Sequence, residues 1–349
     1  MFPGMRKSSS VRLLLRTFAA VLLGVVAVLA SSPKYPQRGS GRPRVGLVMN
    51  GDGAVGFAQI GVLQWLEEHR IPVDYVAGTG VGSLIGGGYA AGKSSLEISK
   101  FIEQIDFSTA LFLGDAPYQE KGKWGKSQLI KLPGVPGIPG LELDAFMPAK
   151  TPDMIVPLLP GIANAYRAPV SFDDLPTPFR CLTADLRSGE LVEFASGSLP
   201  EALRACVTII GVATPVRIGD KILVSGAIIN SIPVDTIKQR GADVVIVSFI
   251  SPRSFSTGGG GTEFTSLMDQ MERGLEVARE KNDSGEMKKA DILIRPDIGS
   301  FTAGDLTRLM ELEKIGYAAA EEKAASLMVL STSPSEWQEY LQNRYSRKR

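Results

Sequence analysis

The sequence predicts an α/β fold with a mainly parallel central sheet covered by helices. Three observations predict this fold class. Short apolar runs are typical of buried strands, amphipathic helices separate the first of these runs, and glycine loops join each strand to the helix that follows it. With 349 residues, 44% of them hydrophobic, the chain is long enough to bury a core of this size.

The first residues are typical of an export signal. Four basic residues precede the uncharged run at 17–30, and Val28 and Ala30 are the small residues of a cleavage site. The run is shorter than the roughly 20 apolar residues that span a bilayer. We therefore predict a signal peptide at 1–30, a Pro/Gly/Arg linker at 31–44 and an exported protein, periplasmic or extracellular. If the signal is not cleaved, it would act as an N-terminal membrane anchor.

Two strand–helix units begin the folded part of the chain. The strand at 45–50 leads through a glycine loop into an amphipathic helix at 57–70, and the strand at 73–78 leads through a second loop into a helix at 83–92. The periodic pattern of apolar residues then weakens from 100 to 162. There the Pro and Gly residues of "LPGVPGIPGLELDAF" predict an excursion loop or lid without regular structure.

Regular patterns return after this excursion. We predict strands at 179–186, 190–196, 242–250 and 291–298, a hairpin at 214–228, a flexible break at 256–264, and helices at 199–209, 265–290 and 305–327. The main domain is predicted to span 45–330. A basic C-terminal tail is predicted at 331–349; its end, "NRYSRKR" at 343–349, is predicted to be solvated, with contact to a membrane surface as the lesser alternative.

Composition excludes several classes of function. Lys and Arg number 38 against 37 Asp and Glu, so the net charge of +1 predicts no nucleic-acid partner. His69 is the single histidine; it ends a helix, where it is predicted to cap it or face solvent, and we predict no metal site and no cofactor. Cys181 and Cys206 are too few for a disulfide scaffold, and whether they pair is left open.

Three glycine-containing stretches could carry chemistry. Gly51, Gly53 and Gly56 form GxGxxG between a strand and a helix, which fits a dinucleotide fingerprint or an anion-stabilising turn. The stretch 78–82 has the shape of a nucleophile elbow but carries glycine at the apex. A third stretch, 225–227, follows the second strand of the predicted hairpin.

Together the three stretches resemble the patatin-like phospholipase family in its bacterial form. That family has Gly-Gly-Gly-x-(Arg/Lys)-Gly at the first loop, Gly-Thr-Ser-x-Gly at the second and Asp-Gly-Gly/Ala at the third. The corresponding residues here are Gly51-Asp52-Gly53-Ala54-Val55-Gly56, Gly78-Thr79-Gly80-Val81-Gly82 and Ser225-Gly226-Ala227. The resemblance implies a three-layer α/β/α fold and a serine acyl hydrolase of lipids that uses a Ser-Asp dyad.

At four positions the sequence departs from the family pattern. Gly80 stands at the nucleophile position, Ser225 at the base position and Val55 at the basic position, while Asp52 adds a carboxylate. Loss of the nucleophile alone costs about a millionfold in rate, by analogy with serine proteases. The resemblance therefore implies a pseudoenzyme with no intact catalytic residue. It would retain a binding role for a lipid, an acyl chain or a membrane surface, or for a protein partner that the sequence does not identify.

Two alternatives stay open. The first is an active lipid acyl hydrolase that uses unconventional residues, for which Ser83, Cys206, or Ser225 with Asp52 as its base are the candidates. The second is a nucleotide-binding protein that uses the GxGxxG loop.

Overall fold

The structure is a computed structural model. It describes residues 41–105, 128–132, 141–145, 158–210, 213–251 and 267–347. The predicted signal peptide, nearly all of the linker and the flexible break at 256–264 lie outside these residues. Within the described ranges, none of the helices combines the length and the apolar character needed to cross a membrane.

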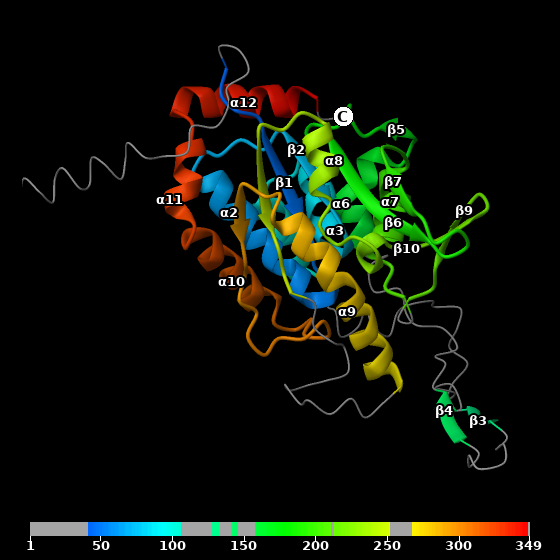
Figure 1. The fold of residues 1–349 in the computed structure, drawn as a ribbon. Coiled ribbons are helices and arrows are strands. Elements are labelled where there is room, and N and C mark those ends of the chain that lie inside the picture. The colour runs from blue at the N-terminus through cyan, green and yellow to red at the C-terminus, as the bar shows by residue number, and fades with distance from the viewer. Residues whose placement is uncertain are drawn as a thin grey trace, which may run out of the picture. The chain divides into compact units, whose positions relative to one another are not determined.

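A mainly parallel sheet forms the centre of the fold (Figure 1). Its strand order is β12-β11-β1-β2-β6-β10-β9, and β7 pairs with β6. The strands from β12 to β6 are parallel neighbours, whereas β7, β10 and β9 join antiparallel. The predicted fold class is confirmed. The strands are β1 Val45–Met49, β2 Tyr75–Gly78, β6 Phe179–Asp185, β7 Leu191–Phe194, β9 Val216–Ile218, β10 Lys221–Ser225, β11 Val244–Ser248 and β12 Ile292–Ile294.

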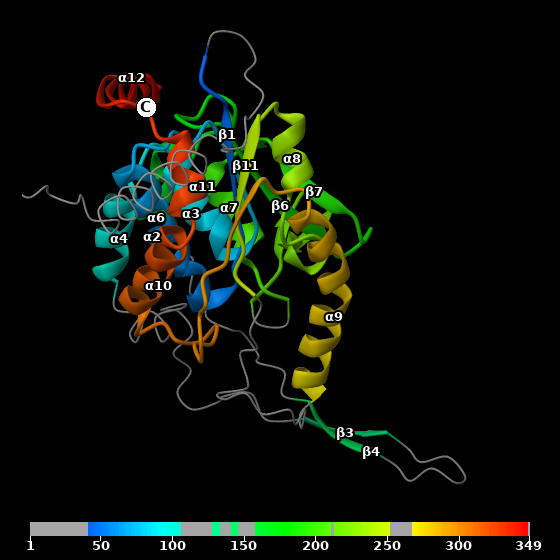
Figure 2. The same cartoon turned by 60° about the vertical axis from the view of Figure 1, so that its left-hand side comes forward.

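Helices cover both faces of this sheet (Figure 2). One face carries α2 Ala58–Glu68, α3 Gly80–Ala90, α4 Ser95–Glu103, α6 Leu159–Ala163, α7 Leu199–Val207 and α10 Leu309–Glu321. The other carries α8 Val234–Gln239 and α9 Leu267–Met287. Side chains alternate between the faces along β1, because successive residues of a strand point to opposite sides. Met49 lies against α3, whereas Val48 joins Ile237 of α8 in a buried apolar cluster.

Part of the predicted excursion loop is regular. β3 Gln128–Leu132 pairs antiparallel with β4 Leu141–Ala145, so the prediction of no regular structure is wrong for these residues. The strands coincide with "QLIKL" and "LELDA", where apolar and polar residues partly alternate, and this alternation is the signal of a strand. The Pro- and Gly-rich stretch between them lies outside the described residues and had dominated the sequence pattern.

The C-terminal tail forms a helix, and one of its basic residues is buried. Ser333 and Glu336 form a capping box at the start of α12 Pro334–Ser346. Arg344 is only 2% exposed, and its Nη2 donates to the carbonyl oxygens of Tyr89 (2.6 Å) and Lys93 (2.8 Å), at the end of α3. The prediction of a solvated tail is therefore wrong for Arg344, whereas most other residues of α12 are exposed.

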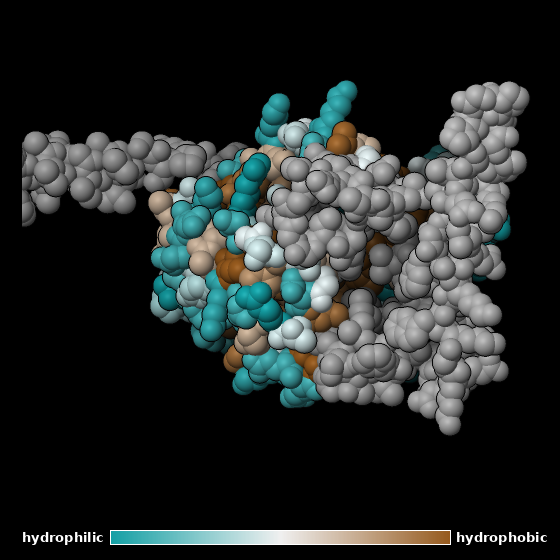
Figure 3. All heavy atoms as spheres, turned by 90° about the horizontal axis from the view of Figure 1, so that it is seen from below, coloured by the Kyte–Doolittle hydropathy of each residue, from teal (hydrophilic) through white to brown (hydrophobic). Residues whose placement is uncertain are grey.

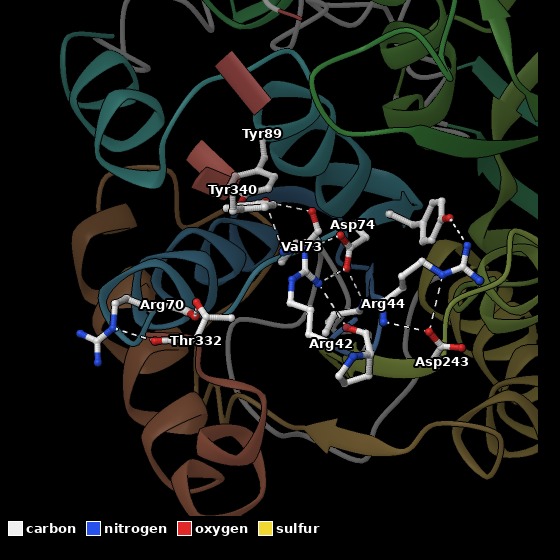
Figure 4. Close-up of polar contacts among 12 residues, drawn as sticks. Arg42, Arg44, Arg70, Val73, Asp74, Tyr89, Asp243, Thr332 and Tyr340 are labelled. Carbon is white, nitrogen blue, oxygen red and sulfur yellow. Dashed lines mark hydrogen bonds and ion pairs between the residues drawn. The ribbon is translucent and has the colours of Figure 1, made fainter. Parts of the chain in front are cut away.

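Helix α12 also contacts the chain just before the start of β2 (Figure 4). The Tyr340 hydroxyl donates to the carbonyl of Val73 and accepts from its N–H, at 2.9 and 3.2 Å. Arg42 stacks on the Tyr340 ring and makes a bidentate ion pair with Asp74 at 2.7 and 2.8 Å. Residues near both ends of the described chain thus meet beside β2.

Candidate functional site

Three turns meet at the edge of the sheet toward which the parallel strands run, at the lower side of Figure 1. The loop after β1 continues into the short 3-10 turn η1 Gly53–Phe57, the elbow joins β2 to α3, and η5 Gly226–Ile228 follows β10. Figure 3, which views this end of the molecule, shows hydrophobic residues exposed among hydrophilic ones. The structure thus brings together the three stretches that the sequence singled out.

The elbow is held by hydrogen bonds on each side of its apex. Thr79 N donates to the carbonyl of Met49 at 3.1 Å, and Thr79 Oγ1 donates to the carbonyl of Ser231 at 2.7 Å. Ser83 Oγ donates to the carbonyl of Gly80 at 2.6 Å. Gly80 itself has φ +56°, a left-handed conformation that glycine adopts without the strain of a side chain.

The space beside Gly80 is already occupied. A Cβ at this position would come closer than 3.0 Å to Oδ1 of Asp52 and to the carbonyl oxygen of Gly51, a distance that real Cβ atoms essentially never show. The glycine loop therefore lies directly against the elbow apex. No residue with a side chain fits at position 80 unless this loop moves.

Two amides near the apex are already bonded within the chain. Val81 N donates to the carbonyl of Gly51 at 2.6 Å, and Ala54 N donates to the carbonyl of Ala303 at 2.7 Å. In serine hydrolases with an elbow, the N–H that follows the nucleophile and one loop N–H stabilise the oxyanion. Here neither amide is free to do so in the described arrangement.

Asp52 is a poorly satisfied carboxylate. Its Oδ1 is buried without a hydrogen-bond partner among the described residues, and its Oδ2 lies 3.5 Å from Nη1 of Arg279. Burial raises the pKa of Asp52 above its ordinary value, and the attraction of Arg279 only partly opposes this shift. The side chain of Asp52 is 23% exposed, but its buried oxygen and one long ionic contact still cost free energy, because the lost hydration is not fully replaced.

Arg279 is a residue of this site that sequence reasoning missed. It projects from α9, and its Nη1 also donates to the carbonyl of Ala227 at 3.2 Å. It therefore joins the first and third of the predicted stretches. The available signal was the spacing of Arg279, Asn282, Asp283 and Glu286, which places four polar side chains on one side of a helix.

The candidate substitute nucleophiles are buried and engaged. Ser225 is 3% exposed, and its Oγ accepts from Ala227 N at 3.3 Å. Cys206 is buried, and burial and contact with the thiol of Cys181 raise its pKa well above the ordinary value of a thiol. Ser83 bonds the elbow carbonyl as described above. Both cysteines are free, so the structure contains no disulfide between them.

The remaining predicted and detected features lie apart from these turns. The His69 ring stacks on Trp65 with centroids 3.9 Å apart, and its Nδ1 lies 2.8 Å from the Trp65 carbonyl oxygen. Among the described residues, no group of three or more His, Cys, Asp or Glu could hold a metal ion.

A cavity of about 480 Å³ lies between α6 and α7 and contains none of the three stretches. It is lined by Leu159, Arg167, Ala168, Ser198, Pro200, Glu201 and Arg204.

Comparison with known proteins places the chain in a family. The family described as "Patatin-like phospholipase" matches residues 47–237, more than half of the chain. An uncharacterized NTE family protein of Mycobacterium tuberculosis (strain ATCC 25618 / H37Rv) is 30% identical over 209 residues, which are 60% of this chain and 49% of that protein. Patatin-like phospholipase domain-containing protein 6 of Mus musculus is 29% identical over 204 residues, covering 58% of this chain and 13% of that protein.

Two further similarities are weaker. Lysophospholipase NTE1 of Mycosarcoma maydis is 27% identical over 217 residues, covering 60% of this chain and 10% of that protein. The crystal structure of VipD from Legionella pneumophila aligns with 85% of this chain and 70% of its own, with TM-score 0.42 and 12% identity. The matched region spans about half the length of the mycobacterial relative and less of the others. On the extent of the family match, this chain belongs to the patatin-like phospholipase family.

Proposed function

We propose that this patatin-like protein does not hydrolyse lipids through a Ser-Asp dyad and instead binds them, holding an acyl chain. A protein partner is the alternative occupant. The observation that carries the proposal is the filled space at Gly80, where Asp52 Oδ1 and the Gly51 carbonyl leave no room for a nucleophilic side chain. By resemblance, this is the position of the family's serine.

Three further observations support the proposal. The amides of Val81 and Ala54 are bonded within the chain, so they do not serve a developing oxyanion. Ser225, at the base position by resemblance, has a hydroxyl that cannot accept a proton near neutral pH. The negative charge of the Asp52 carboxylate would also repel the negative charge that an oxyanion develops during ester hydrolysis.

The first test is hydrolysis of p-nitrophenyl butyrate and of lysophospholipid micelles by the purified protein. We expect the wild type and its Gly80→Ala variant to be equally inactive. Gly80→Ser with Ser225→Asp should also stay inactive, because Asp52 still crowds the new serine. Adding Asp52→Gly to this pair removes the carboxylate and makes the loop more flexible, so that the Gly51 carbonyl can also move away from position 80, and we expect measurable esterase activity only in the triple variant.

The second test is binding. A fluorescent fatty acid such as cis-parinaric acid should bind the wild type saturably and be displaced by unlabelled oleate. No saturable binding to fatty acids or to phospholipid vesicles would rule out the lipid-binding role, and the search would turn to a protein partner.

One observation favours a second candidate function, an active hydrolase with unconventional residues. Asp52 Oδ1 is an unbonded oxygen that lies next to the apex. A raised pKa brings this carboxyl closer to the range of a general base that activates water. Turnover by the wild type that disappears in Asp52→Asn but persists in Ser225→Ala would establish this candidate. The nucleotide-binding alternative lacks comparable support, since Ala54 N within the glycine loop is already bonded.

We also propose that the protein is exported, on the strength of the basic and apolar pattern of residues 1–30. Cell fractionation followed by N-terminal sequencing tests it. We expect a mature chain that begins near Ser31, and an uncleaved chain in the membrane fraction would instead indicate an anchor.

A further inference from the structure

Helix α9 contacts the rest of the fold through an unusual face. Its stripe of Arg279, Asn282, Asp283 and Glu286 follows the helical spacing i, i+3, i+4, i+7. A surface helix ordinarily buries an apolar stripe of this spacing. Here the stripe is polar and mostly charged, so the hydrophobic effect contributes little to its attachment.

Each of these four side chains bonds a different main-chain group of the segment 227–234. Arg279 and Asn282 donate to the carbonyls of Ala227 (3.2 Å) and Ile229 (2.7 Å), and Asp283 and Glu286 accept from the amides of Ser231 (3.3 Å) and Val234 (3.1 Å). The helix therefore follows the chain that leads from η5 into α8. Figures 1 and 2 both show α9 below α8 and extending past the lower ends of the strands.

The described residues on the other sides of α9 face solvent. Val277 is 52% exposed, and Gly274, Lys281 and Ser284 are exposed as well. Asp283 and Glu286 are buried, and burial raises the pKa of Asp283 above its ordinary value, since its bonds to Ser231 and the nearby Arg279 only partly compensate. Buried charged groups add little net stability even when they are paired, so this attachment is weak for its size.

The two ends of the polar stripe differ. At its C-terminal end, Met287 packs against the apolar cluster under α8, and Lys289 pairs with Asp235 and Glu286. At its other end, Arg279 contacts Asp52, and its Nε is buried without a hydrogen-bond partner among the described residues. Among the described side chains of α9, those at the C-terminal end are thus anchored by apolar packing, whereas Arg279 at the glycine loop is held by incompletely satisfied polar contacts.

We propose that α9 is a detachable strap, hinged at Met287, which closes the turn region by tying the Asp52 loop to the segment 227–234 and opens it when the polar stripe releases. Closure places Arg279 between the first and third stretches, and opening frees both Asp52 and the Ala227 carbonyl. The expected effect of strap opening on ligand binding rests on the lipid-binding function proposed above. The strap itself does not depend on that function.

Hydrogen exchange of the full chain, read by mass spectrometry and NMR, tests the strap. In Arg279→Gln with Asp283→Asn we expect the amides of Ser231 and Val234 to exchange at least about tenfold faster, which corresponds to about 1.4 kcal/mol. Amides of β1 and β11 should keep their protection. Lys281→Gln, on the exposed side of the same helix, is the matched control and should exchange like the wild type.

Two outcomes would overturn the strap. Unchanged exchange at Ser231 and Val234 would mean that the stripe does not hold the segment. Equal loss of protection in β1 and β11 would mean that α9 is an integral part of the core and cannot detach separately.

Fatty-acid binding provides the second readout. If opening exposes the site, the double variant should bind cis-parinaric acid several times more tightly than the wild type, because a larger fraction of molecules is open. Equal affinity would contradict control of the site by α9. Absence of binding by every variant would contradict the lipid-binding function, while the exchange data would still decide whether α9 detaches.

Discussion

Oδ1 of Asp52 lies where the side chain of any other residue at Gly80 would begin. Asp52 lies in the loop after β1 and Gly80 in the turn after β2. The two residues are compatible in size. A glycine at the apex leaves space for the aspartate, and the aspartate closes that space to a nucleophile. Any attempt to restore hydrolysis must therefore change both positions.

Replacing Gly80 by alanine should destabilise the protein more than its backbone angle alone predicts. The left-handed conformation costs a residue with a side chain about 1–2 kcal/mol, and the contacts with Asp52 and Gly51 add to this. Gly299→Ala is the matched control, since Gly299 has φ +52° and open space around it. Urea unfolding measures both variants, and equal losses would mean that the loop moves aside freely.

Replacing Asp52 by asparagine should change how stability depends on pH. Because the pKa of Asp52 is raised in the folded state, the folded protein holds this proton at pH values where the unfolded chain has lost it. The contribution of Asp52 therefore lowers stability as pH rises through that window. Relative to wild type, Asp52→Asn should gain stability as pH rises from acid to neutral, in thermal unfolding at several pH values. Asp220→Asn, which makes the same replacement in an exposed turn, is the matched control.

Truncating Arg344 should weaken the attachment of α12. Arg344→Ala removes the donors to the Tyr89 and Lys93 carbonyls and the cation stacked 3.7 Å from the centroid of the Tyr89 ring. We expect a loss of about 3 kcal/mol, typical of breaking a buried charged contact. Arg347→Ala, on the exposed end of the helix, should cost less than about 0.5 kcal/mol in the same denaturant titration.

The thiol of Cys206 should resist alkylation in the folded protein. Burial and the neighbouring Cys181 thiol keep its pKa well above the ordinary value, so little thiolate forms near neutral pH. Mass spectrometry after iodoacetamide treatment should find neither cysteine modified under native conditions and both modified in urea. Rapid native labelling of Cys206 would show an open, reactive thiol and revive it as a candidate nucleophile.

Much of the fold was predictable because its signals are local. The apolar run at β1 and the glycine loops that follow β1 and β2 predict strand–helix units, and the sheet follows from their repetition. The β3–β4 hairpin was missed because the Pro and Gly residues between its strands outweighed their local alternation, whereas the prediction for the C-terminal tail failed at Arg344 because it depended on neighbours distant in sequence. Arg344 looks like part of a basic tail until the carbonyls at the end of α3, about 250 residues earlier, are placed beside it.

The candidate site divides in the same way. Residues 51–56 and 78–82 could be found from spacing, since a tight turn at a strand end needs glycine at particular positions, whereas 225–227 gained its meaning from the resemblance to the family. The sequence shows that position 80 is glycine and position 52 is aspartate, but it does not show that the two residues are in contact. Only the tertiary structure decides three contacts: Asp52 lies against Gly80, the Val81 amide donates to the Gly51 carbonyl, and Arg279 of α9 pairs with Asp52. Each contact joins segments that the folded sheet, and not the local sequence, places side by side.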